Sequence, residues 1–346
     1  MNLSNQSVLV IGGAGYIGSH VVLALCEKGY NVTVFDNLST GQEINIDSRA
    51  ELIKGNILKN NDLKSAFNQS YDAVLHFAAL KAAGESMLQP GEYATANITG
   101  TINILNQMIE HKVQNIIFSS TAAVYGIPEY LPIDEDHTLN PINFYGFTKF
   151  EIERILHWYS KLKGICYATL RYFNAAGYDL NGRIQGLEKN PVNLLPIVME
   201  TALGKRASLN VFGNNYNTPD GTGIRDYIHV KDAAVASVDI LEEKYNDSYI
   251  MISGNQTVKV KDILNMINEM LNGAIKIEYV NSENEDHYEI TPYTFRPRLA
   301  KKILLKEYHE LGQGILDSIY DTYKRIGKTS GKKDLNIVLP ESVDFK

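Results

Sequence analysis

The fold is decided near the N-terminus by one stretch, Val8-Leu9-Val10-Ile11-Gly12-Gly13-Ala14-Gly15-Tyr16-Ile17-Gly18-Ser19-His20. Four apolar residues lead into a turn in which Gly12, Gly15 and Gly18 recur at every third position, and residues 13–18 also fit the pattern G-x-G-x-x-G. Residues 17–28 then have the length and pattern of an amphipathic helix. A strand, a glycine-rich turn and a helix in this order predict a loop whose backbone approaches an anionic ligand at the positive end of the helix.

Short apolar runs alternate with helix-length segments through the first half of the chain. The runs at 8–11, 32–35, 73–77, 115–118 and 166–171 predict buried strands, and 17–28, 91–111 and 145–162 predict helices between them. This alternation predicts an α/β fold, a doubly wound parallel sheet of the Rossmann type. The regularity fades after Asn174, and helix-like segments recur at 192–203, 230–244 and 260–271.

We therefore expect two domains. Residues 1–178 form the nucleotide-binding domain, and residues 179–346 form a smaller mixed α/β substrate-binding domain. Segments near 225–250 are expected to return to the first domain.

The composition limits location and partners. The 346 residues include 33 Lys and Arg against 40 Asp and Glu, a net charge of −7, which argues against a general nucleic-acid or membrane-surface binder. The 44% of hydrophobic residues supply a core, and no apolar run approaches the ~20 residues of a membrane span. Residues 1–7 lack the features of a signal peptide, and Cys26 and Cys166 make no disulfide framework. We expect a soluble cytoplasmic protein without nucleic-acid or membrane partners and without a metal site.

The second predicted strand ends in a carboxylate. Asp36 lies 18 residues beyond Gly18, where a carboxylate accepts hydrogen bonds from an adenosine ribose diol and repels a 2′-phosphate. No arginine occurs among residues 37–40. Together with the glycine-rich turn, this pattern predicts NAD rather than NADP as cofactor. A glycine-rich turn without a ligand is the alternative.

A proton-transfer pair opens the helix predicted at 145–162. Tyr145 and Lys149 are four residues apart, so the phenol and the ammonium share one face of the helix. Free tyrosine has a pKa near 10, and lowering that pKa to about 7 takes roughly 4 kcal/mol of differential stabilisation. A lysine cation and a positively charged nicotinamide ring supply it. Chance occurrence of this spacing on a surface helix is the alternative.

A hydroxyl is expected beside this pair. Thr121 follows the strand predicted at 115–118, and the carboxyl end of a parallel strand faces the ligand crevice. Thr121 is therefore expected to bind a sugar hydroxyl and to pass a proton toward Tyr145. Ser119 and Ser120 are alternatives for this position, and capping of the following turn is their structural alternative.

The sequence resembles the extended short-chain dehydrogenase/reductase family and, within it, the UDP-hexose 4-epimerases. The resemblance runs from about Val8 to Leu271 and is carried by residues 12–20, 35–38, 76–86, 118–126, 170–177 and 220–230. Its most specific segments are Leu80-Lys81-Ala82-Ala83-Gly84-Glu85-Ser86 and Asp220-Gly221-Thr222-Gly223-Ile224-Arg225-Asp226-Tyr227-Ile228-His229-Val230. Both are longer and more particular than a glycine-rich nucleotide loop.

The resemblance implies a set of site residues. The catalytic positions would fall on Tyr145, Lys149 and Thr121. The NAD contacts would fall on Gly12, Gly15, Tyr16, Ile17, Gly18, Asp36, Asn37, Asn56, Ile57, Phe77, Ala78, Ala79, Lys81, Asn97, Tyr145, Lys149 and Tyr172. The UDP-sugar contacts would fall on Lys81, Thr121, Tyr145, Phe173, Asn174, Asn193, Leu194, Asn210, Phe212 and Arg225.

Two of these implied contacts have structural alternatives. Phe212 is expected near the uracil, and a core position is its alternative. Arg225 is expected on the diphosphate, where its planar guanidinium matches two phosphate oxygens. Its alternative is pairing with Asp226.

Two segments depart from the family pattern. The family has Gly-Asp-Ile after the third strand, where the Asp contacts adenine, whereas this chain has Gly55-Asn56-Ile57, whose amide still hydrogen-bonds the ring. The family also has a late Arg-x-Gly-Asp segment near the diphosphate, and residues 281–288 here are an acidic run instead. Arg296 or Arg298 is a candidate replacement for the missing cation, and exposure of the segment to solvent is the alternative. Tyr293 is placed near the residue that admits N-acetylated sugars.

The resemblance implies reversible 4-epimerisation of a UDP-hexose, UDP-glucose or UDP-galactose, through a 4-keto intermediate, by a homodimer with tightly bound NAD. A 4-epimerase of UDP-N-acetylhexosamines or UDP-uronic acids uses the same catalytic residues and is an alternative. A nucleotide-sugar dehydratase needs an acid/base pair after the strand-end hydroxyl, and Ala122 and Ala123 occupy those positions. A protein that senses NAD without catalysis is a further alternative. Such a sensor does not need the Tyr145 and Lys149 pair, so the presence of this pair argues against it.

Overall fold

The structure is a computed structural model. It describes residues 6–179, 181–184, 189, 191, 193–202, 204–213, 216, 218–243, 247–254, 257–270, 273 and 276–280.

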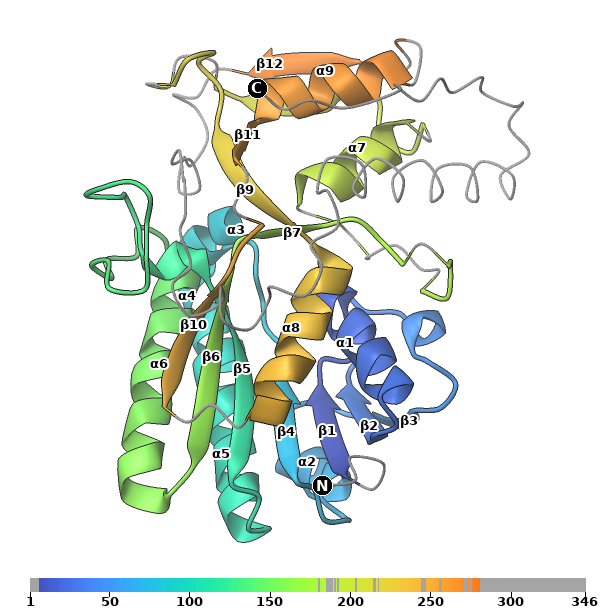
Figure 1. Ribbon diagram of the computed structural model, residues 1–346, viewed down its shortest axis with the longest axis vertical. Coiled ribbons are helices and arrows are strands. Elements are labelled where there is room, and N and C mark those ends of the chain that lie inside the picture. The colour runs from blue at the N-terminus through green and yellow to red at the C-terminus, as the bar shows by residue number, and fades with distance from the viewer. Residues whose placement is uncertain are drawn as a thin grey trace.

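Seven parallel strands form the main sheet, in the order β10-β6-β5-β4-β1-β2-β3 (Figure 1). The strands are β1 (Ser7–Ile11), β2 (Asn31–Asp36), β3 (Glu51–Lys54), β4 (Ala73–His76), β5 (Asn115–Thr121), β6 (Cys166–Tyr172) and β10 (Ser248–Ile252). The predicted doubly wound parallel sheet is confirmed.

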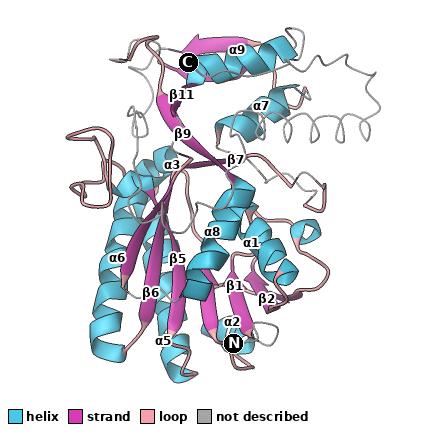
Figure 2. Ribbon diagram, in the orientation of Figure 1, coloured by secondary structure: helices cyan, strands magenta, loops and turns pink. Residues whose placement is uncertain are grey.

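Alternate residues of each strand are buried against opposite layers. Val8 and Val10 of β1 belong to a core cluster that includes residues of the helices α1 (Tyr16–Glu27) and α8 (Val230–Glu243). Leu9 and Ile11 belong to a second cluster, with residues of α2 (Asn60–Ala66), α5 (Gly100–Glu110) and α6 (Phe144–Lys163). Figure 2 shows α8 in front of the strands and α5 behind them. Both faces of the sheet are therefore covered, which explains why its strands are apolar runs rather than alternating ones.

The segment expected as one helix at 91–111 is divided in the structure. After α3 (Ala83–Leu88), the chain forms α4 (Pro90–Tyr93), a π-helical turn η3 (Ala94–Thr99) and α5. A π-helical turn inserts into an otherwise α-helical pattern, so the apolar periodicity of the sequence did not reveal it. The turn positions the buried Asn97.

Two smaller sheets stand beyond the carboxyl ends of the large sheet, at the top of Figure 1. One contains β7 (Asn174–Ala176), β9 (Ile224–His229) and β11 (Thr257–Lys259), and the other contains β8 (Leu209–Phe212) and β12 (Ile277–Val280). They share a third apolar cluster with α7 (Leu194–Ala202) and α9 (Val260–Met270).

The chain crosses between the two parts. From β9 it enters α8, which packs against α1, and β10 then pairs with β6 at the edge of the large sheet. Two short 3-10 turns, η2 (Glu43–Asn45) and η4 (Ala122–Val124), complete the described elements. No helix in the described part of the chain has the length and apolarity to cross a membrane.

Candidate active site

The strand order reverses at β1, which pairs with β2 on one side and β4 on the other. In sheets of this kind, ligands bind in the crevice outside the carboxyl ends of the strands at such a point. The glycine-rich turn follows β1, and Ala78 follows β4. Thr121 ends the neighbouring strand β5. The predicted nucleotide loop and the predicted acid/base residues are therefore on the same edge of the sheet.

The glycines of the turn are required by close contacts. Gly12 has a φ of +82°, and a Cβ atom on it would lie 2.4 Å from the backbone nitrogen of Ala78. A Cβ atom on Gly18 would lie 2.2 Å from the oxygen of Gly12, so Gly18 allows α1 to pack against the turn. At Gly15 the nearest atom is the Gly12 oxygen, at 3.3 Å. This contact is tight, although looser than those at Gly12 and Gly18, and Gly15 is the N-cap of α1 without a side chain to cap it. An open helix N-terminus beside a close backbone turn fits the pyrophosphate of a dinucleotide.

Asp36 is held at the end of β2 by two backbone groups. One oxygen accepts a hydrogen bond from the nitrogen of Ala14 at 2.9 Å, and the other accepts one from the nitrogen of Leu38 at 2.8 Å. Each carboxylate oxygen has a second lone pair. The side chain is thus fixed beside the glycine-rich turn and still able to accept from a ribose diol.

Neighbouring side chains shape the loops around this position. Asn37 accepts from the nitrogen of Ser39 at 3.0 Å, and Asn56 accepts from the nitrogen of Leu58 at 2.9 Å, so both amide oxygens close local turns. The oxygen of Ile57 accepts from Asn103 at 3.1 Å. These contacts leave the amide nitrogen of Asn56 as the group suited to a ring acceptor.

Two residues expected at the cofactor have their polar groups engaged within the protein. Asn97 accepts from the nitrogen of Leu80 and donates to the oxygen of Leu80 and to Thr148, at 2.8, 3.0 and 3.0 Å. It therefore fixes the segment after β4 against α6. The hydroxyl of Tyr172 lies 2.6 Å from that of Ser237 on α8, and Tyr172 is buried in the core.

Other predicted cofactor residues lie around the carboxyl edge of the large sheet. The nitrogens of Phe77 and Ala78 donate to the oxygen of Ile11, at 2.8 and 3.1 Å, which brings the end of β4 to the turn after β1. Ala79 and Lys81 follow as half-buried residues. The hydroxyl of Tyr16 donates to the oxygen of Gly177 at 2.5 Å, which links the start of α1 to the loop after β7.

The first turn of α6 carries Tyr145 and is fixed by two side chains. Asn143 is the N-cap and accepts from the nitrogen of Gly146 at 2.7 Å. Ser86 of α3 accepts from the nitrogen of Tyr145 at 2.9 Å. A Cβ atom on Gly146 would lie 2.7 Å from the oxygen of Ala123, so the helix begins in close contact with the segment after β5. The backbone of Tyr145 is therefore held at the segment that follows Thr121.

Lys149 is buried one turn further along α6. Its ammonium donates to the oxygen of Ser119 at 2.7 Å, lies 4.6 Å from the centroid of the Phe118 ring and lies 5.9 Å from the centroid of the Tyr145 ring. Burial lowers its pKa to about 7, and the charge of Glu153 acts in the opposite direction. One of three ammonium donors is used by Ser119. The cation is thus adjacent to the phenol, and its protonation changes near neutral pH.

The three hydroxyls at the end of β5 have different environments. Ser120 is buried and donates to Glu153 at 2.6 Å. Ser119 is partly buried and its backbone oxygen binds Lys149. Thr121 accepts from the nitrogen of Ala123 at 3.2 Å, as the N-cap of η4. Of the three, Thr121 is the one at the strand end, two residues before Ala123, which contacts the first turn of α6.

The residues predicted for the nucleotide sugar lie mostly on the smaller sheets. Asn174 of β7 donates to the backbone oxygen of Asp226 at 3.0 Å, and Asn210 is an exposed residue of β8. The backbone of Phe212 pairs with β12. Asn193 is exposed just before α7, and Leu194 is its partly buried first residue.

Arg225 lies on β9, where it pairs with Val258 of β11 in the smaller three-stranded sheet. One of its guanidinium nitrogens donates to the oxygen of Ile224 at 3.2 Å. Burial raises the pKa of Tyr227 to about 12, and the charge of Arg225 acts against that rise. The carboxylate of Asp226 accepts from Ser253 and from the nitrogen of Gly254, at 2.8 and 2.9 Å.

The late segment singled out in the sequence lies outside the described residues. This applies to the acidic run at 281–288 and to Tyr293, Arg296 and Arg298. Within the described part of the chain, no group of three or more His, Cys, Asp or Glu side chains is arranged to hold a metal ion.

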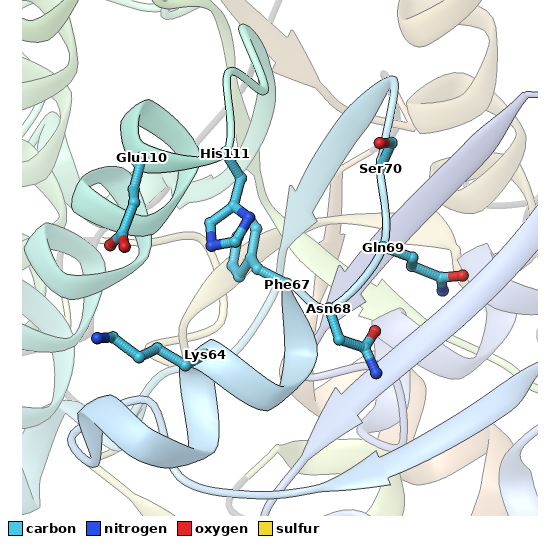
Figure 3. A pocket seen from close by; sticks show the side chains of 7 residues that line it. All are labelled: Lys64, Phe67, Asn68, Gln69, Ser70, Glu110 and His111. Atoms are coloured by element: carbon cyan, nitrogen blue, oxygen red, sulfur yellow. The ribbon is translucent and has the colours of Figure 1, made fainter.

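A separate surface cavity of about 380 Å³ lies away from this site. Figure 3 shows its lining side chains, which come from the ends of α2 and α5 and from the segment before β4: Lys64, Phe67, Asn68, Gln69, Ser70, Glu110 and His111. That segment enters β4 at its amino end, whereas Thr121 and Tyr145 are at carboxyl ends. The cavity is on the opposite edge of the sheet from the candidate active site.

The sequence reasoning missed four residues that support the site. Ser86 and Asn143 fix Tyr145, and Glu153 and Arg171 form a buried ion pair behind Lys149. Glu153 continues the spacing of Tyr145 and Lys149 by four more residues, a pattern that was available in the sequence. Asn143 precedes the helix and is a typical N-cap residue.

Comparison with known proteins agrees with this geometry. A family model described as the NAD dependent epimerase/dehydratase family matches residues 8–251. The chain belongs to this family. The resemblance found in the sequence is thereby confirmed.

Individual relatives fit the same picture. A UDP-glucose 4-epimerase of Halalkalibacterium halodurans is 42% identical over 285 residues, which are 81% of this chain and 85% of that protein. The structure of UDP-glucose 4-epimerase from Bifidobacterium longum in complex with NAD+ and UDP has a TM-score of 0.86 and 30% identity, over 92% of this chain and 98% of that one. A UDP-Glc/GlcNAc 4-epimerase from Campylobacter jejuni has a TM-score of 0.75 and 30% identity, over 92% and 99%.

Proposed function

We propose that this protein catalyses the reversible 4-epimerisation of a UDP-hexose, interconverting UDP-glucose and UDP-galactose, with tightly bound NAD. The observation that carries the proposal is the placement of Tyr145 and Lys149. The phenol and the buried ammonium lie together at the same sheet edge as the open glycine turn. Family membership and the sequence-similar epimerases support the same reaction.

The residues that would hold NAD follow from the edge of the large sheet. The turn at Gly12, Gly15 and Gly18 takes the pyrophosphate at the start of α1, and Asp36 takes the adenosine ribose. Asn56 takes the adenine, and Phe77 to Lys81 line the nicotinamide side. When bound, NAD accepts a hydride from the carbon that is oxidised and gives it back.

The chain itself handles the proton of the 4-hydroxyl. Tyr145 removes this proton as carbon 4 is oxidised and returns it as carbon 4 is reduced. The Lys149 cation stabilises the phenolate, and the bond to Ser119 holds the cation in place. Burial lowers the pKa of Lys149 to about 7, and because a phenolate at Tyr145 favours the protonated form of Lys149, the two groups titrate as a coupled pair. Thr121 binds the sugar hydroxyl and relays its proton.

Inversion requires that the sugar turns while the nucleotide stays bound. Arg225 is chemically suited to the diphosphate, and residues at β7, α7 and β8 are proposed for the uridine side: Asn174, Asn193, Leu194, Asn210 and Phe212. Lys81 and Phe173 are proposed at the sugar. The substrate is then anchored by its UDP portion and loosely held at its hexose.

A second sugar class has its own support. The Campylobacter relative is named for both UDP-Glc and UDP-GlcNAc, and a UDP-N-acetylhexosamine or a UDP-uronic acid would use the same Tyr145 and Lys149. A dehydratase is disfavoured because Ala122 and Ala123, after Thr121, carry no group that transfers a proton.

The test uses the purified protein without added NAD. We expect UDP-galactose to be converted to UDP-glucose, and heat denaturation to release about one NAD per chain. A parallel panel contains UDP-N-acetylgalactosamine and UDP-glucuronic acid. Absence of turnover on every member of the panel, with NAD present in the protein, would contradict the proposed function.

We further propose that the protein is a homodimer that works in the cytoplasm, in galactose metabolism. Phe147, Trp158 and Leu162 of α6 have exposed fractions of 40, 57 and 69%. Positions 11 and 15 residues beyond the first are about three and four helical turns away, so the three side chains share one side of α6. An apolar helix side of this kind fits the same side of a second copy.

Sedimentation velocity tests the dimer. Trp158→Asp is expected to shift the protein to a monomer. Ile127→Asp, at a residue with an exposed fraction of 65% in the loop after η4, is the matched control and is expected to leave the dimer intact. A wild-type protein that sediments as a monomer at micromolar concentration would contradict this assembly.

A further inference from the structure

A buried ion pair lies directly behind the candidate catalytic residues. Glu153 of α6 and Arg171 of β6 have exposed fractions of 1 and 2%. The guanidinium donates to both carboxylate oxygens, at 3.0 Å from Nε and 2.7 Å from Nη2. A buried pair of this kind adds little net stability compared with apolar residues of similar size. Its presence therefore calls for another explanation.

The pair connects the elements that carry the active site. Glu153 accepts from Ser120 at 2.6 Å, and Ser120 lies between Ser119, which binds the Lys149 ammonium, and Thr121. Arg171 pairs with Ser120 across the strands β5 and β6. The Glu153 carboxylate thus joins α6 to the end of β5. The bond is made at Ser120, the strand residue between Ser119 and Thr121.

Arg171 is held from further elements. It donates to the hydroxyl of Tyr125 at 3.0 Å. Its guanidinium carbon lies 5.0 Å from the ring centroid of Tyr125 and 4.9 Å from that of Tyr249 on β10. These contacts fix the guanidinium, which in turn fixes Glu153.

The helix places Glu153 beside Lys149. Tyr145, Lys149 and Glu153 are spaced by four residues, so their side chains follow one stripe of α6, with Cβ atoms of successive members about 6 Å apart. The negative charge of Glu153 raises the pKa of Lys149, against the larger effect of burial. The buried charges Lys149, Glu153 and Arg171 sum to +1, and a Tyr145 phenolate makes the group neutral.

Other ionisable groups face the same region. His76 of β4 is buried, its pKa is lowered to about 3 by burial and by the charge of Lys149, and it is therefore neutral at the pH values of interest. Tyr93 and Glu85, joined by a hydrogen bond of 2.7 Å, lie on the side of Tyr145. Burial raises the pKa of Tyr125 and of Tyr93, so both stay protonated. Glu153 and Arg171 are thus the paired charges behind Lys149.

We propose that Glu153 and Arg171 are positioning residues of the proposed reaction, which hold the end of β5 against α6 and set the charge at the Tyr145–Lys149 pair. The inference rests on the proposed function. It assigns to a buried ion pair, which touches neither substrate nor cofactor, control over the pH range in which the catalytic pair works.

Opposite shifts of the pH profile follow from this assignment. Glu153→Gln removes a negative charge, which favours loss of a proton from both Tyr145 and Lys149, so both limbs of the profile move to lower pH. With a charge about 6 Å away and an effective dielectric near 20, the Lys149 limb shifts by about two pH units, and the more distant Tyr145 limb shifts by less. Arg171→Met removes a positive charge and moves both limbs to higher pH, by less, because Arg171 lies behind Glu153.

The experiment measures kcat/KM for the UDP-hexose between pH 5 and 10. Wild type, Glu153→Gln, Arg171→Met and the double variant Glu153→Gln/Arg171→Met are compared, and Glu153→Asp, which keeps the charge, is the conservative control. The double variant is expected between the two single variants, and Glu153→Asp within about 0.3 pH unit of wild type. Since a single uncompensated buried charge can prevent folding, the double variant and Glu153→Asp keep the test decisive.

A second readout does not depend on activity. NMR of protein with 13Cε-labelled lysine follows the titration of Lys149, whose signal is identified by its loss in Lys149→Met. The Lys149 midpoint is expected to fall in Glu153→Gln or, where that variant does not fold, in the double variant. A loss of kcat without any shift of the profile or of the Lys149 midpoint would overturn the proposal and leave a purely structural ion pair. Wild-type inactivity on the sugar panel together with a shifted midpoint would overturn the proposed function and not the charge assignment.

Discussion

The helices α1 and α6 both begin at the edge of the large sheet that carries the candidate active site, but their N-termini are capped differently. α1 begins at Gly15, which has no side chain to cap the helix. α6 begins at Asn143, which caps the nitrogen of Gly146, while Ser86 accepts from the nitrogen of Tyr145. Both helix starts carry the same positive end of a backbone dipole.

This difference separates binding from chemistry. An uncapped start keeps its backbone N–H groups for an anion from outside, as the proposed pyrophosphate is. At the start of α6, side chains of the protein accept hydrogen bonds from the backbone N–H groups of the first turn. This turn is therefore a fixed support for Tyr145, the proposed acid/base residue. Substitutions at the two helix starts should therefore affect different properties of the protein.

Loss of the phenol at the capped start should stop the chemistry and spare cofactor binding. Tyr145→Phe removes the proton acceptor and leaves the ring and the contacts of α6. We expect kcat to fall by about 10³-fold, in the range typical of a lost general acid–base group, with NAD still bound. Steady-state kinetics and the NAD content of the purified variant check this. Turnover near that of wild type would contradict the acid/base assignment.

A capping side chain added at the N-terminus of α1 should weaken NAD binding with little effect on the stability of the fold. Gly15→Asp supplies a carboxylate at the N-cap of α1, where it replaces the anion. Asp is a good N-cap, but its Cβ atom would lie 3.3 Å from the Gly12 oxygen, which is a tight contact, so we expect the unfolding free energy of the nucleotide-free protein to change by no more than about 1 kcal/mol. NAD affinity should fall by about 100-fold through charge repulsion.

Calorimetric titration with NAD and urea unfolding measure the two effects. Gly91→Asp is the matched control, because it places the same side chain in the first turn of α4, where no atom lies within 4 Å of the new Cβ. It should leave NAD affinity unchanged. Equal NAD affinity of Gly15→Asp and wild type would show that α1 does not hold the cofactor.

The buried ammonium one turn into α6 gives a pH signature. Burial lowers the pKa of Lys149 from its usual 10.5 to about 7, so between these values the unfolded chain binds the proton and the folded chain does not. Stability of the nucleotide-free protein then rises with pH from about 7 to about 10.5, by up to about 1.4 kcal/mol per pH unit from this group. Below pH 7 the folded protein carries the full cost of a buried charge.

Lys149→Met isolates this contribution. Urea unfolding at pH 7, 8 and 9 should show a smaller rise with pH in the variant than in wild type, and greater stability of the variant at pH 7. Identical slopes for the two proteins would mean that Lys149 is not titrating in the folded state.

The smallest effect is expected at the cap itself. Asn143→Ala leaves the nitrogen of Gly146 without its acceptor and should lower the unfolding free energy by about 1 kcal/mol. We expect kcat to drop several-fold, because the first turn of α6 loosens around Tyr145. Asn143→Asp, which keeps an acceptor, should restore both values. A fall in stability that Asn143→Asp does not reverse would point to a contact other than the cap.

The contrast also shows what the sequence could predict. The uncapped start of α1 was predictable from the sequence. Gly12 and Gly18 lie so close to neighbouring backbone that only glycine fits there, and the spacing of these glycines is a local sequence pattern. The pair Tyr145 and Lys149 was predictable for the same reason, since helix geometry makes positions four apart neighbours.

Contacts between distant segments were not predictable in this way. Ser86 reaches the nitrogen of Tyr145 across 59 residues, and Tyr172 bonds Ser237 across 65. No local pattern records either contact, and Tyr172 was expected at the cofactor on resemblance alone. Asn97 was likewise expected there, and the π-helical turn that directs its amide to Leu80 and Thr148 leaves no trace in the apolar periodicity.

The candidate substrate residues depended on the resemblance. Asn174, Asn210 and Arg225 lie on short strands of the smaller sheets, whose partners come from other parts of the chain. Short strands with distant partners carry weak local signals, so spacing alone did not identify them. The assignment of these residues stays a prediction.

The central claim is that the hydrogen on carbon 4 leaves and returns within one bound complex, while Tyr145 moves only the proton of the hydroxyl. The most direct measurement is the fate of deuterium in UDP-galactose labelled at carbon 4, converted by the wild-type protein in ordinary water. The account predicts UDP-glucose that retains the deuterium at carbon 4. Loss of the deuterium to water would contradict it.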